Sequence, residues 1–278
     1  MKKKIIILGY KGFIGARLFK EFKKKKFNVI GLKIPRPNYT EDIKKFYINY
    51  INKILIKNND VSYVINCAGS ISCKTNSDFF FNSEFDIIFQ KIVLKKKMSL
   101  KYLTLNSTKV FTNCLDKYTL SKKELNKNYL SENNFYILYL DLIFQKNSIH
   151  YKKIFELLKK WSHFKIPIFY PGKIFYPIDL NNLCKEIFNI TTIKQSKNKI
   201  IILGNKKFTF YEIIVYVKKK SFLQNKFRLL KSKYFNSMPN FVKNIFYRSK
   251  FLQMMDNKNW LNYINQEKFL LKKIKTSL

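Results

Sequence analysis

The feature that most constrains the fold is an alternation of short apolar segments with segments of helical periodicity. The apolar segments are found at 4–8, 27–32, 61–69, 100–107 and 135–144. Between the first two, Ile14, Leu18 and Phe22 would share one face of a helix from Phe13 to Lys25. Apolar strands that alternate with helices are typical of a parallel sheet with helices on both faces. We therefore predict an α/β chain built on a doubly wound parallel sheet.

Further helices are expected between the remaining strands and, in a less regular pattern, after residue 145. Their predicted ranges are 41–58, 78–97, 118–133 and 150–162. Prolines and a glycine then predict turns and short strands, and Thr209 with Glu212 forms a capping-box pattern. The lysine-rich stretch from about 229 to 278 predicts helix. We expect a first domain over 1–145 and a second region over 146–278, from which segments near 174–190 return to the first.

The net charge of +38 in 278 residues raises the question of a polyanionic partner. The basic residues are nearly all lysine, whereas readers of nucleic acid favour the planar fork of arginine. Asn, Ile, Phe and Tyr are also abundant, and with Lys they are encoded by A/T-rich codons. We therefore attribute most of the charge to genome composition and expect no specific nucleic-acid partner. An anionic small substrate would still be attracted by this field.

Two other classes of protein are disfavoured by the sequence. No apolar stretch approaches the roughly 18 residues of a membrane span, so we expect a cytoplasmic protein without one. The four cysteines, Cys67, Cys73, Cys114 and Cys184, form no C-x-x-C pair and are accompanied by only two histidines. We therefore predict no metal site and no disulfide framework, and interpret the cysteines as reduced, mostly buried thiols.

Three glycines, Gly9, Gly12 and Gly15, follow the first predicted strand in the pattern G-x-x-G-x-x-G. Such a turn lets backbone N–H groups approach a pyrophosphate, and the helix N-terminus adds partial positive charge. The spacing differs from the G-x-G-x-x-G form. On this evidence alone, a phosphate site and a simple structural turn remain equally compatible with the pattern.

A second group of residues indicates chemistry. Ser107 ends a predicted strand, and Tyr118 and Lys122 lie four apart on the next helix, which places them on one face. A nearby ammonium favours the phenolate, so we expect Lys122 to lower the pKa of Tyr118. Tyr118 could then exchange a proton with a carbonyl or hydroxyl oxygen held by Ser107. In a chain with this many tyrosines and lysines, such a pair is also compatible with a solvated helix surface.

The order of these motifs is more specific than any one of them. The glycine turn, the segment NCAG at 66–69, Ser107 and then Y-x-x-x-K follow one another along the chain. In this order the sequence resembles the extended short-chain dehydrogenase/reductase superfamily, in its branch of NAD-dependent epimerase/dehydratases and nucleotide-sugar reductases. The resemblance covers about residues 4–215. It implies a Rossmann-type fold with a smaller C-terminal substrate-binding region.

The resemblance also implies roles for individual residues. Gly9, Gly12 and Gly15 would hold the cofactor pyrophosphate, with Phe13 and Ile14 opening the helix. Asn66, Cys67, Ala68 and Gly69 match the segment that lines the adenosine side, and Asn82 matches an asparagine that supports the site. Ser107, Tyr118 and Lys122 match the catalytic triad, in which the lysine also binds the nicotinamide ribose.

The end of the second predicted strand bears on the choice of cofactor. An acidic residue there would bind the ribose hydroxyls of NAD, but this chain has Lys33 followed by Arg36. Both can pair with a 2′-phosphate, so we predict NADP in preference to NAD. The alternative is that both are ordinary surface charges.

The predicted function follows from the resemblance. We expect an NAD(P)-dependent oxidoreductase or epimerase that acts on a nucleotide-linked sugar, by 4-keto reduction or C4 epimerisation. Thr108 and Lys109 stand where dehydratases of the family carry acids, so dehydration is disfavoured. Relatives commonly form homodimers, so a homodimer is compatible with this prediction. The alternative from another class is a non-catalytic Rossmann-fold protein that binds a polyanion or a protein partner through its basic surface.

Overall fold

The structure is a computed structural model, and it describes most of the chain. The described residues are 3–36, 42–71, 73–112, 114–130, 132, 134–162, 165–170, 174–193, 195–231 and 269–276. They divide into two compact units. The first contains the described residues up to Leu140, then Asn181–Ile202 and the last strand up to Lys272. Each unit is described below by itself.

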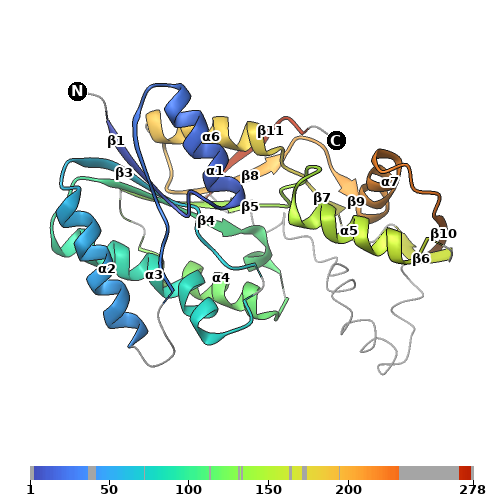
Figure 1. The fold of residues 1–278 in the computed structure, drawn as a ribbon, viewed down its shortest axis with the longest axis horizontal. Helices are drawn as coiled ribbons and strands as arrows, with labels where there is room; N and C mark the ends of the chain where they lie inside the picture. The colour runs from blue at the N-terminus through green and yellow to red at the C-terminus, as the bar shows by residue number, and fades with distance from the viewer. Residues whose placement is uncertain are drawn as a thin grey trace. The chain divides into compact units, whose positions relative to one another are not determined.

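The first unit is built on a seven-stranded sheet (Figure 1). Its strands are β1 (Lys4–Leu8), β2 (Asn28–Leu32), β3 (Val61–Asn66), β4 (Lys101–Ser107), β5 (Phe135–Leu140), β8 (Lys199–Gly204) and β11 (Leu270–Ile274). They lie in the order β11-β8-β5-β4-β3-β1-β2, and the pairs from β2 to β8 are parallel. The order reverses between β1 and β3, because β2 lies on one side of β1 and the later strands lie on the other.

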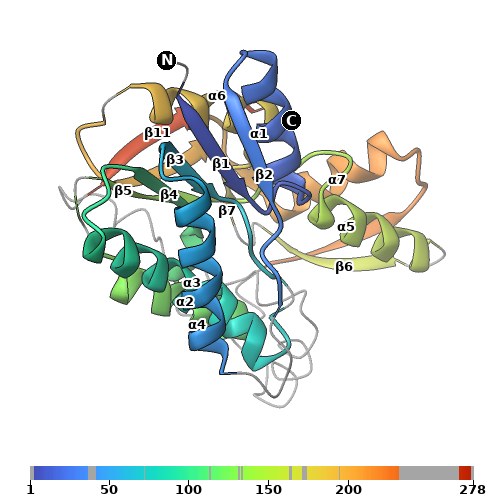
Figure 2. The same cartoon turned by 60° about the vertical axis from the view of Figure 1, so that its left-hand side comes forward.

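Helices cover both faces of this sheet (Figures 1 and 2). One face carries α1 (Phe13–Lys24) and α6 (Leu180–Thr192), and the other carries α2 (Ile43–Lys57), α3 (Asn76–Lys95) and α4 (Lys117–Asn128). Phe22 of α1 and Phe188 of α6 contact each other, with ring centroids 5.3 Å apart. On the opposite face, Phe89 of α3 stacks on Tyr102 of β4 at 4.4 Å. The sheet is therefore buried on both sides, as its continuous apolar strands predict.

The candidate site lies at the point where the strand order reverses. In open parallel sheets, ligands bind outside the carboxyl ends of the strands at such a switch point. Here the carboxyl ends of β1 and β3 lead directly into the glycine turn and into the segment 66–69. β4 ends at Ser107, one strand further along the sheet, and continues as the short 3₁₀ helix η1 (Thr108–Phe111).

The second unit contains smaller sheets and two helices. Its elements are α5 (Ile149–Lys160), β6 (Lys165–Tyr170), β7 (Ile174–Phe175), β9 (Phe208–Thr209), α7 (Phe210–Lys220) and β10 (Lys226–Lys231). β6 pairs with β10 in parallel, and β7 pairs with β9 in the antiparallel direction. One apolar cluster, which includes Phe144, Leu158, Ile168 and Ile214, forms its core. At the start of α7, the Thr209 hydroxyl accepts from the Glu212 N–H, so the predicted capping box is confirmed.

The predicted fold class and the first nine strands and helices are confirmed. Some ends differ: the strand predicted to reach residue 144 ends at Leu140, and the helix predicted to reach 133 ends at Asn128. The prediction of helix from about 229 onwards is wrong where it can be compared, because residues up to Lys231 belong to β10 and Leu270–Ile274 form β11. Residues 232–268 lie outside the described part. Among the helices in the described ranges, none has the length and apolarity needed to cross a bilayer.

Candidate cofactor and catalytic site

The glycine turn joins the ends of β1, β2 and β3. Gly9 has a φ of 74°, in the left-handed region, and its N–H donates to the Leu32 carbonyl at the end of β2. A Cβ added to Gly9 would lie 2.8 Å from the Ala68 nitrogen. The structure therefore brings Gly9 together with the predicted adenosine-side segment and with the start of the β2 loop. This contact requires glycine for both conformation and space.

The helix that follows begins without a side-chain cap. Its N-cap is Gly12, and the first helical hydrogen bond runs from the Ala16 N–H to the Gly12 carbonyl. The N–H groups of Phe13, Ile14 and Gly15 precede that bond, so they lack helical acceptors. A Cβ on Gly15 would lie 2.3 Å from the Gly9 carbonyl oxygen, so only glycine lets the helix start against the turn. An uncapped helix start at a switch point fits a pyrophosphate group.

The segment after β3 is fixed by two buried asparagines. The Asn66 Oδ1 accepts from the Ala68 N–H at 3.0 Å, which forms the turn that contacts Gly9. Asn82 of α3 both accepts from the Ser70 N–H at 2.8 Å and donates to the Ser70 carbonyl at 2.9 Å. Cys67 continues the sheet, because its N–H donates to the Leu8 carbonyl. Asn82 therefore supports this segment through its backbone.

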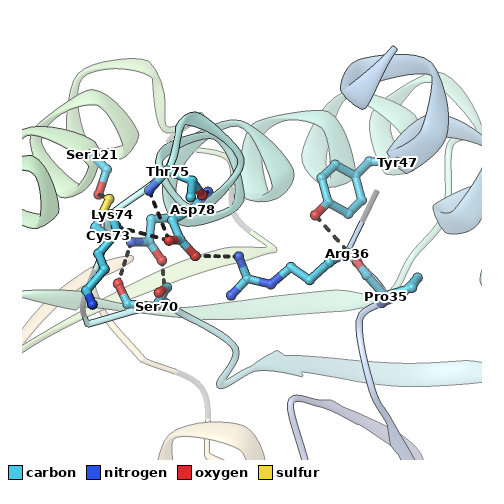
Figure 3. A network of polar contacts seen from close by, with 10 residues as sticks. Pro35, Arg36, Tyr47, Ser70, Cys73, Lys74, Thr75, Asp78 and Ser121 are labelled. Carbon is cyan, nitrogen blue, oxygen red and sulfur yellow. Dashed lines mark hydrogen bonds and ion pairs between the residues drawn. The ribbon is translucent and has the colours of Figure 1, made fainter. Parts of the chain in front are cut away.

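The two basic residues after β2 have different surroundings. Lys33 directly follows β2 and is exposed beside the glycine turn, and its carbonyl accepts from the Tyr50 hydroxyl at 2.8 Å. Arg36 instead donates to Asp78 of α3 at 2.6 Å (Figure 3). Its guanidinium also lies over the Phe81 ring, 4.2 Å from the ring centroid. The structure thus leaves Lys33 beside the turn and directs the Arg36 guanidinium towards α3.

Asp78 is the centre of the polar network that holds Arg36. Its Oδ2 accepts from the backbone N–H groups of Lys74 and Thr75, and the Thr75 hydroxyl accepts from the Asp78 N–H in return (Figure 3). Burial raises the pKa of the Asp78 carboxyl, but hydrogen bonds from Thr75, Ser70 and Arg36 lower it to about 2. Asp78 is therefore ionised at neutral pH and joins the loop after β2 to the start of α3.

Ser107 is placed by its own neighbours at the end of β4. Its N–H donates to the Asn106 side chain at 2.8 Å, and its Oγ accepts from the Lys109 N–H at 3.2 Å. The Asn106 Nδ2 also donates to the Lys122 carbonyl in α4 at 3.3 Å. The Ser107 side chain also hydrogen-bonds with Tyr118. Asn106 links the end of the strand to the helix that carries Tyr118.

Tyr118 is held in its protonated form. Burial and, to a smaller extent, the negative charge of Asp116 raise the pKa of Tyr118 to about 12, although a hydrogen bond with the Ser107 side chain opposes both. Ser107 and Tyr118 are thus brought into contact, as the predicted triad requires. The prediction that the Tyr118 pKa is lowered is wrong in direction, because burial outweighs the favourable interactions of the phenolate.

Lys122 is buried and faces the sheet. Its side chain is 4% exposed, and its Nζ donates to the Leu105 carbonyl of β4 at 3.0 Å. Burial lowers the pKa of Lys122, while the negative charge of Asp86 in α3 opposes that effect. The groups that act on the Lys122 pKa are Asp86 and Cys73, whereas those that act on Tyr118 are Asp116, Ser107 and Cys73. The lysine therefore interacts with α3 and β4.

Asp116 and Lys109 complete the surroundings of Tyr118. Asp116 is the N-cap of α4, and its carboxylate accepts from the Thr119 N–H at 3.0 Å and from the Cys114 thiol at 2.8 Å. Lys109 Nζ lies 3.7 Å from the same carboxylate and 6.0 Å from the centroid of the Tyr118 ring. Burial would raise the Asp116 pKa, but the Cys114 hydrogen bond and the Lys109 charge lower it to about 2. A cation therefore lies close to the candidate proton donor.

Sequence reasoning missed three residues that shape this site. Asn106 and Asp116 lie directly beside predicted residues, but their roles depend on hydrogen bonds across the chain. Asp86 had a visible signal, because it is an acid in the largely apolar segment DFFFNSEFDIIF. An acid on the buried side of a helix calls for a partner.

The parallel sheet with helices on both faces and a glycine turn at its switch point is a Rossmann-like fold, and solved structures share it. One solved structure of this kind is a dTDP-4-dehydrorhamnose reductase from Clostridium acetobutylicum, with a TM-score of 0.64 and 15% identity. The match covers 82% of this chain and 84% of that chain. At this identity the likeness establishes the fold.

Two further solved structures carry related activities in their names. A GDP-mannoheptose C4 reductase from Campylobacter jejuni with NADP bound has a TM-score of 0.57 and 17% identity, covering 83% of this chain and 88% of that chain. A UDP-glucose 4-epimerase with UDP-glucose from Thermotoga maritima has a TM-score of 0.60 and 12% identity, covering 82% and 85%. No family model and no curated protein matches the sequence.

Proposed function

We propose that the protein is an NADPH-dependent reductase of a keto group on a nucleotide-linked sugar. The observation that carries the proposal is a half-buried, protonated Tyr118 hydrogen-bonded to Ser107, beyond the carboxyl end of the same sheet that holds the glycine turn. A neutral phenol and a serine hydroxyl at one point are the donors that a carbonyl oxygen needs as it gains negative charge.

The cofactor would be held by the residues at the switch point. The free N–H groups at the start of α1 would bind the pyrophosphate, and the Asn66–Gly69 turn would line the adenosine side. Lys122 would contact the nicotinamide ribose. When bound, the cofactor supplies the hydride that reaches the carbonyl carbon.

The chain's own residues would supply the proton. Tyr118 donates its phenolic proton to the sugar oxygen, which becomes a hydroxyl, and the phenolate regains a proton from solvent. Ser107, whose Oγ accepts from the Lys109 N–H, donates a hydrogen bond to the same oxygen. Lys122, whose charge interacts with Asp86 and not with Tyr118, would hold the nicotinamide ribose. These roles need a tyrosine that starts each cycle protonated.

The direction of the Tyr118 pKa favours reduction over epimerisation. An epimerase of this kind begins by taking a proton from a sugar hydroxyl, which requires the phenolate. With a pKa of about 12, Tyr118 is almost entirely protonated at neutral pH and acts as an acid. The fold is shared with reductases and with a 4-epimerase alike, so the choice between the two reactions rests on Tyr118.

The proposed preference for NADP rests on Lys33. Lys33 is exposed directly after β2, where a 2′-phosphate would lie, whereas the Arg36 guanidinium is bound by Asp78. Positive charge without an acidic residue at this position favours the phosphorylated ribose. The second unit, which contains α5 and α7, would bind the nucleotide-linked sugar.

The proposal is tested by binding and then by turnover. Purified protein is titrated with NADPH and NADH by fluorescence, and nucleotide-linked 4-keto sugars are screened for oxidation of NADPH. Tyr118→Phe should lose at least about a hundredfold in kcat while NADPH binding stays within threefold, because only the proton donor is removed. Tyr63→Phe removes a hydroxyl at the opposite end of the sheet and should keep full activity. Failure of the wild-type protein to bind either cofactor would contradict the proposal.

A further inference from the structure

Asp86 is a buried acid that the proposed reaction does not use. It lies in α3 and is 2% exposed. Its Oδ1 accepts from the Asn66 Nδ2 at 2.9 Å and from the Tyr102 hydroxyl of β4, and the Thr104 side chain also hydrogen-bonds to it. Amide and hydroxyl donors directed at one carboxylate oxygen stabilise its ionised form. These donors oppose the rise in the Asp86 pKa that burial causes, so the carboxylate needs a further favourable interaction to keep a negative charge in the interior of the first unit.

The positive charge that matches it belongs to Lys122. Burial raises the pKa of Asp86 and lowers the pKa of Lys122, and in each case the charge of the other group opposes the effect of burial. α3 and α4 pack against each other on the same face of the sheet (Figure 2). A buried ammonium without an anion loses its proton, so the charge of Lys122 depends on a partner inside the fold.

The other titratable groups near this pair do not replace Asp86. The Tyr102 hydroxyl hydrogen-bonds to Asp86, and the Asp86 charge acts on Tyr129. Burial, with the Asp86 charge, raises the pKa of both tyrosines well above their usual range, so they are neutral. Cys73 acts on Lys122, and burial raises the pKa of that thiol. Within the described residues, Asp86 is the carboxylate that acts on Lys122.

Asp86 also reaches the cofactor side of the site. Asn66 uses its Nδ2 to bind Asp86 and its Oδ1 to accept from the Ala68 N–H, at 3.0 Å. Ala68 is the residue that packs against Gly9. One carboxylate is therefore connected to the catalytic helix through Lys122 and to the cofactor turn through Asn66.

We propose that Asp86 is a positioning residue that keeps Lys122 charged inside the fold and ties it to the cofactor turn through Asn66. The proposal deepens the proposed function, because the charged lysine is the group that would hold the nicotinamide ribose. Its first part does not depend on catalysis, so it can be tested on the folded protein alone. An Asp86 that served only to fill space would have no specific coupling to Lys122.

The first test is a double-mutant cycle on stability, which needs neither cofactor nor substrate. The variants are Asp86→Asn, Lys122→Met and the pair together, unfolded by denaturant at neutral pH. In the wild-type background, Asp86→Asn should raise the equilibrium constant for unfolding at least tenfold. In the Lys122→Met background the same change should cost less or stabilise, because it removes an uncompensated charge. Equal effects in both backgrounds would overturn the proposal.

A surface acid provides the matched control. Asp60 pairs with Lys4 at 2.7 Å, and its side chain is 63% exposed. Asp60→Asn makes the same chemical change outside the interior and should alter the unfolded fraction less than threefold in either background. If Asp60→Asn behaves like Asp86→Asn, the effect is not specific to the buried pair.

The second test uses the pH dependence of the loaded enzyme. Removing Asp86 takes away the charge that raises the Lys122 pKa, so Asp86→Asn should move the alkaline decline of NADPH binding and of kcat to lower pH by at least one unit. The KM for the sugar should stay within threefold. An unmoved decline would overturn the proposal. A wild-type protein that binds no NADPH would instead contradict the proposed function and leave the stability cycle as the test of Asp86.

Discussion

Gly9 packs directly on the backbone of Ala68, and this contact joins the two turns that would enclose the cofactor. The added Cβ of Gly9→Ala would lie 2.8 Å from the Ala68 nitrogen, at a residue whose φ is 74°. Backbone strain and overpacking together predict a loss of about 2–4 kcal/mol in the free energy of unfolding. NADPH binding should be lost with it.

Gly69→Ala provides the control for stability in that experiment. Its Cβ would meet the Asn82 Oδ1 at 3.5 Å, which is an ordinary contact distance. Chemical denaturation should show a change of less than about 1 kcal/mol for Gly69→Ala. Equal losses in the two variants would mean that the Gly9–Ala68 contact is not what limits the turn.

The Tyr118 pKa predicts different pH profiles for the two reaction directions. Because the pKa is about 12, the phenolate fraction rises about tenfold per pH unit throughout the neutral range. Oxidation of the sugar alcohol, which needs the phenolate, should show log kcat/KM rising with a slope near one between about pH 7 and pH 9. Reduction should show no decline from Tyr118 over the same range. A plateau in the oxidation profile below pH 9 would indicate a lower Tyr118 pKa.

Asp116 predicts an acid-sensitive contribution to stability. Its pKa is about 2 in the folded chain and near 3.8 without these interactions, so its contribution is present above about pH 4 and is lost as the pH falls towards 2. Asp116→Ala also removes the cap of α4 and should cost about 1 kcal/mol at neutral pH. Asp116→Asn keeps a capping side chain, so it should cost less. Denaturation of the three proteins at pH 6 and pH 3 separates the cap from the charge.

Lys33 and Arg36 should differ in their effects on cofactor choice. Lys33→Ala should weaken NADPH binding about tenfold and leave NADH binding within threefold, because only NADPH carries the 2′-phosphate. Arg36→Ala should have a smaller effect on that ratio, because its guanidinium is bound by Asp78. Lys57→Ala, at the exposed end of α2, is the control for a general loss of charge. A larger effect of Arg36→Ala on the NADPH/NADH ratio would reverse the assignment of the two residues.

The elements of the first unit were predictable because each one satisfies a local rule. The strands from β1 to β5 are apolar runs bounded by polar residues, and the helices between them carry one apolar face. β11 was not predictable in this way. Its residues alternate between half-buried and exposed, and lysines fill a sequence that suits a helix equally well. Its pairing beside β8 decides its conformation, and that pairing is a tertiary interaction.

In the site, the sequence indicated residue types and order but not the balance of forces on them. Spacing placed Tyr118 and Lys122 in one helix, yet it could not show that Tyr118 is buried enough to raise its pKa. Nor could it show that Lys122 interacts with Asp86, which lies far from it in the sequence. Both depend on how α3, α4 and β4 pack, which is a property of the folded unit.

The place of β11 in the sheet has a consequence for synthesis. The first unit takes its strands from the beginning of the chain, from β8 and finally from residues 270–274. During translation, β8 therefore presents an unpaired edge until residues 270–274 have left the ribosome. Exposed edges of this kind template association between chains. We expect the nascent protein to need a chaperone that covers this edge during that interval. A fragment that stops at Lys231 should aggregate.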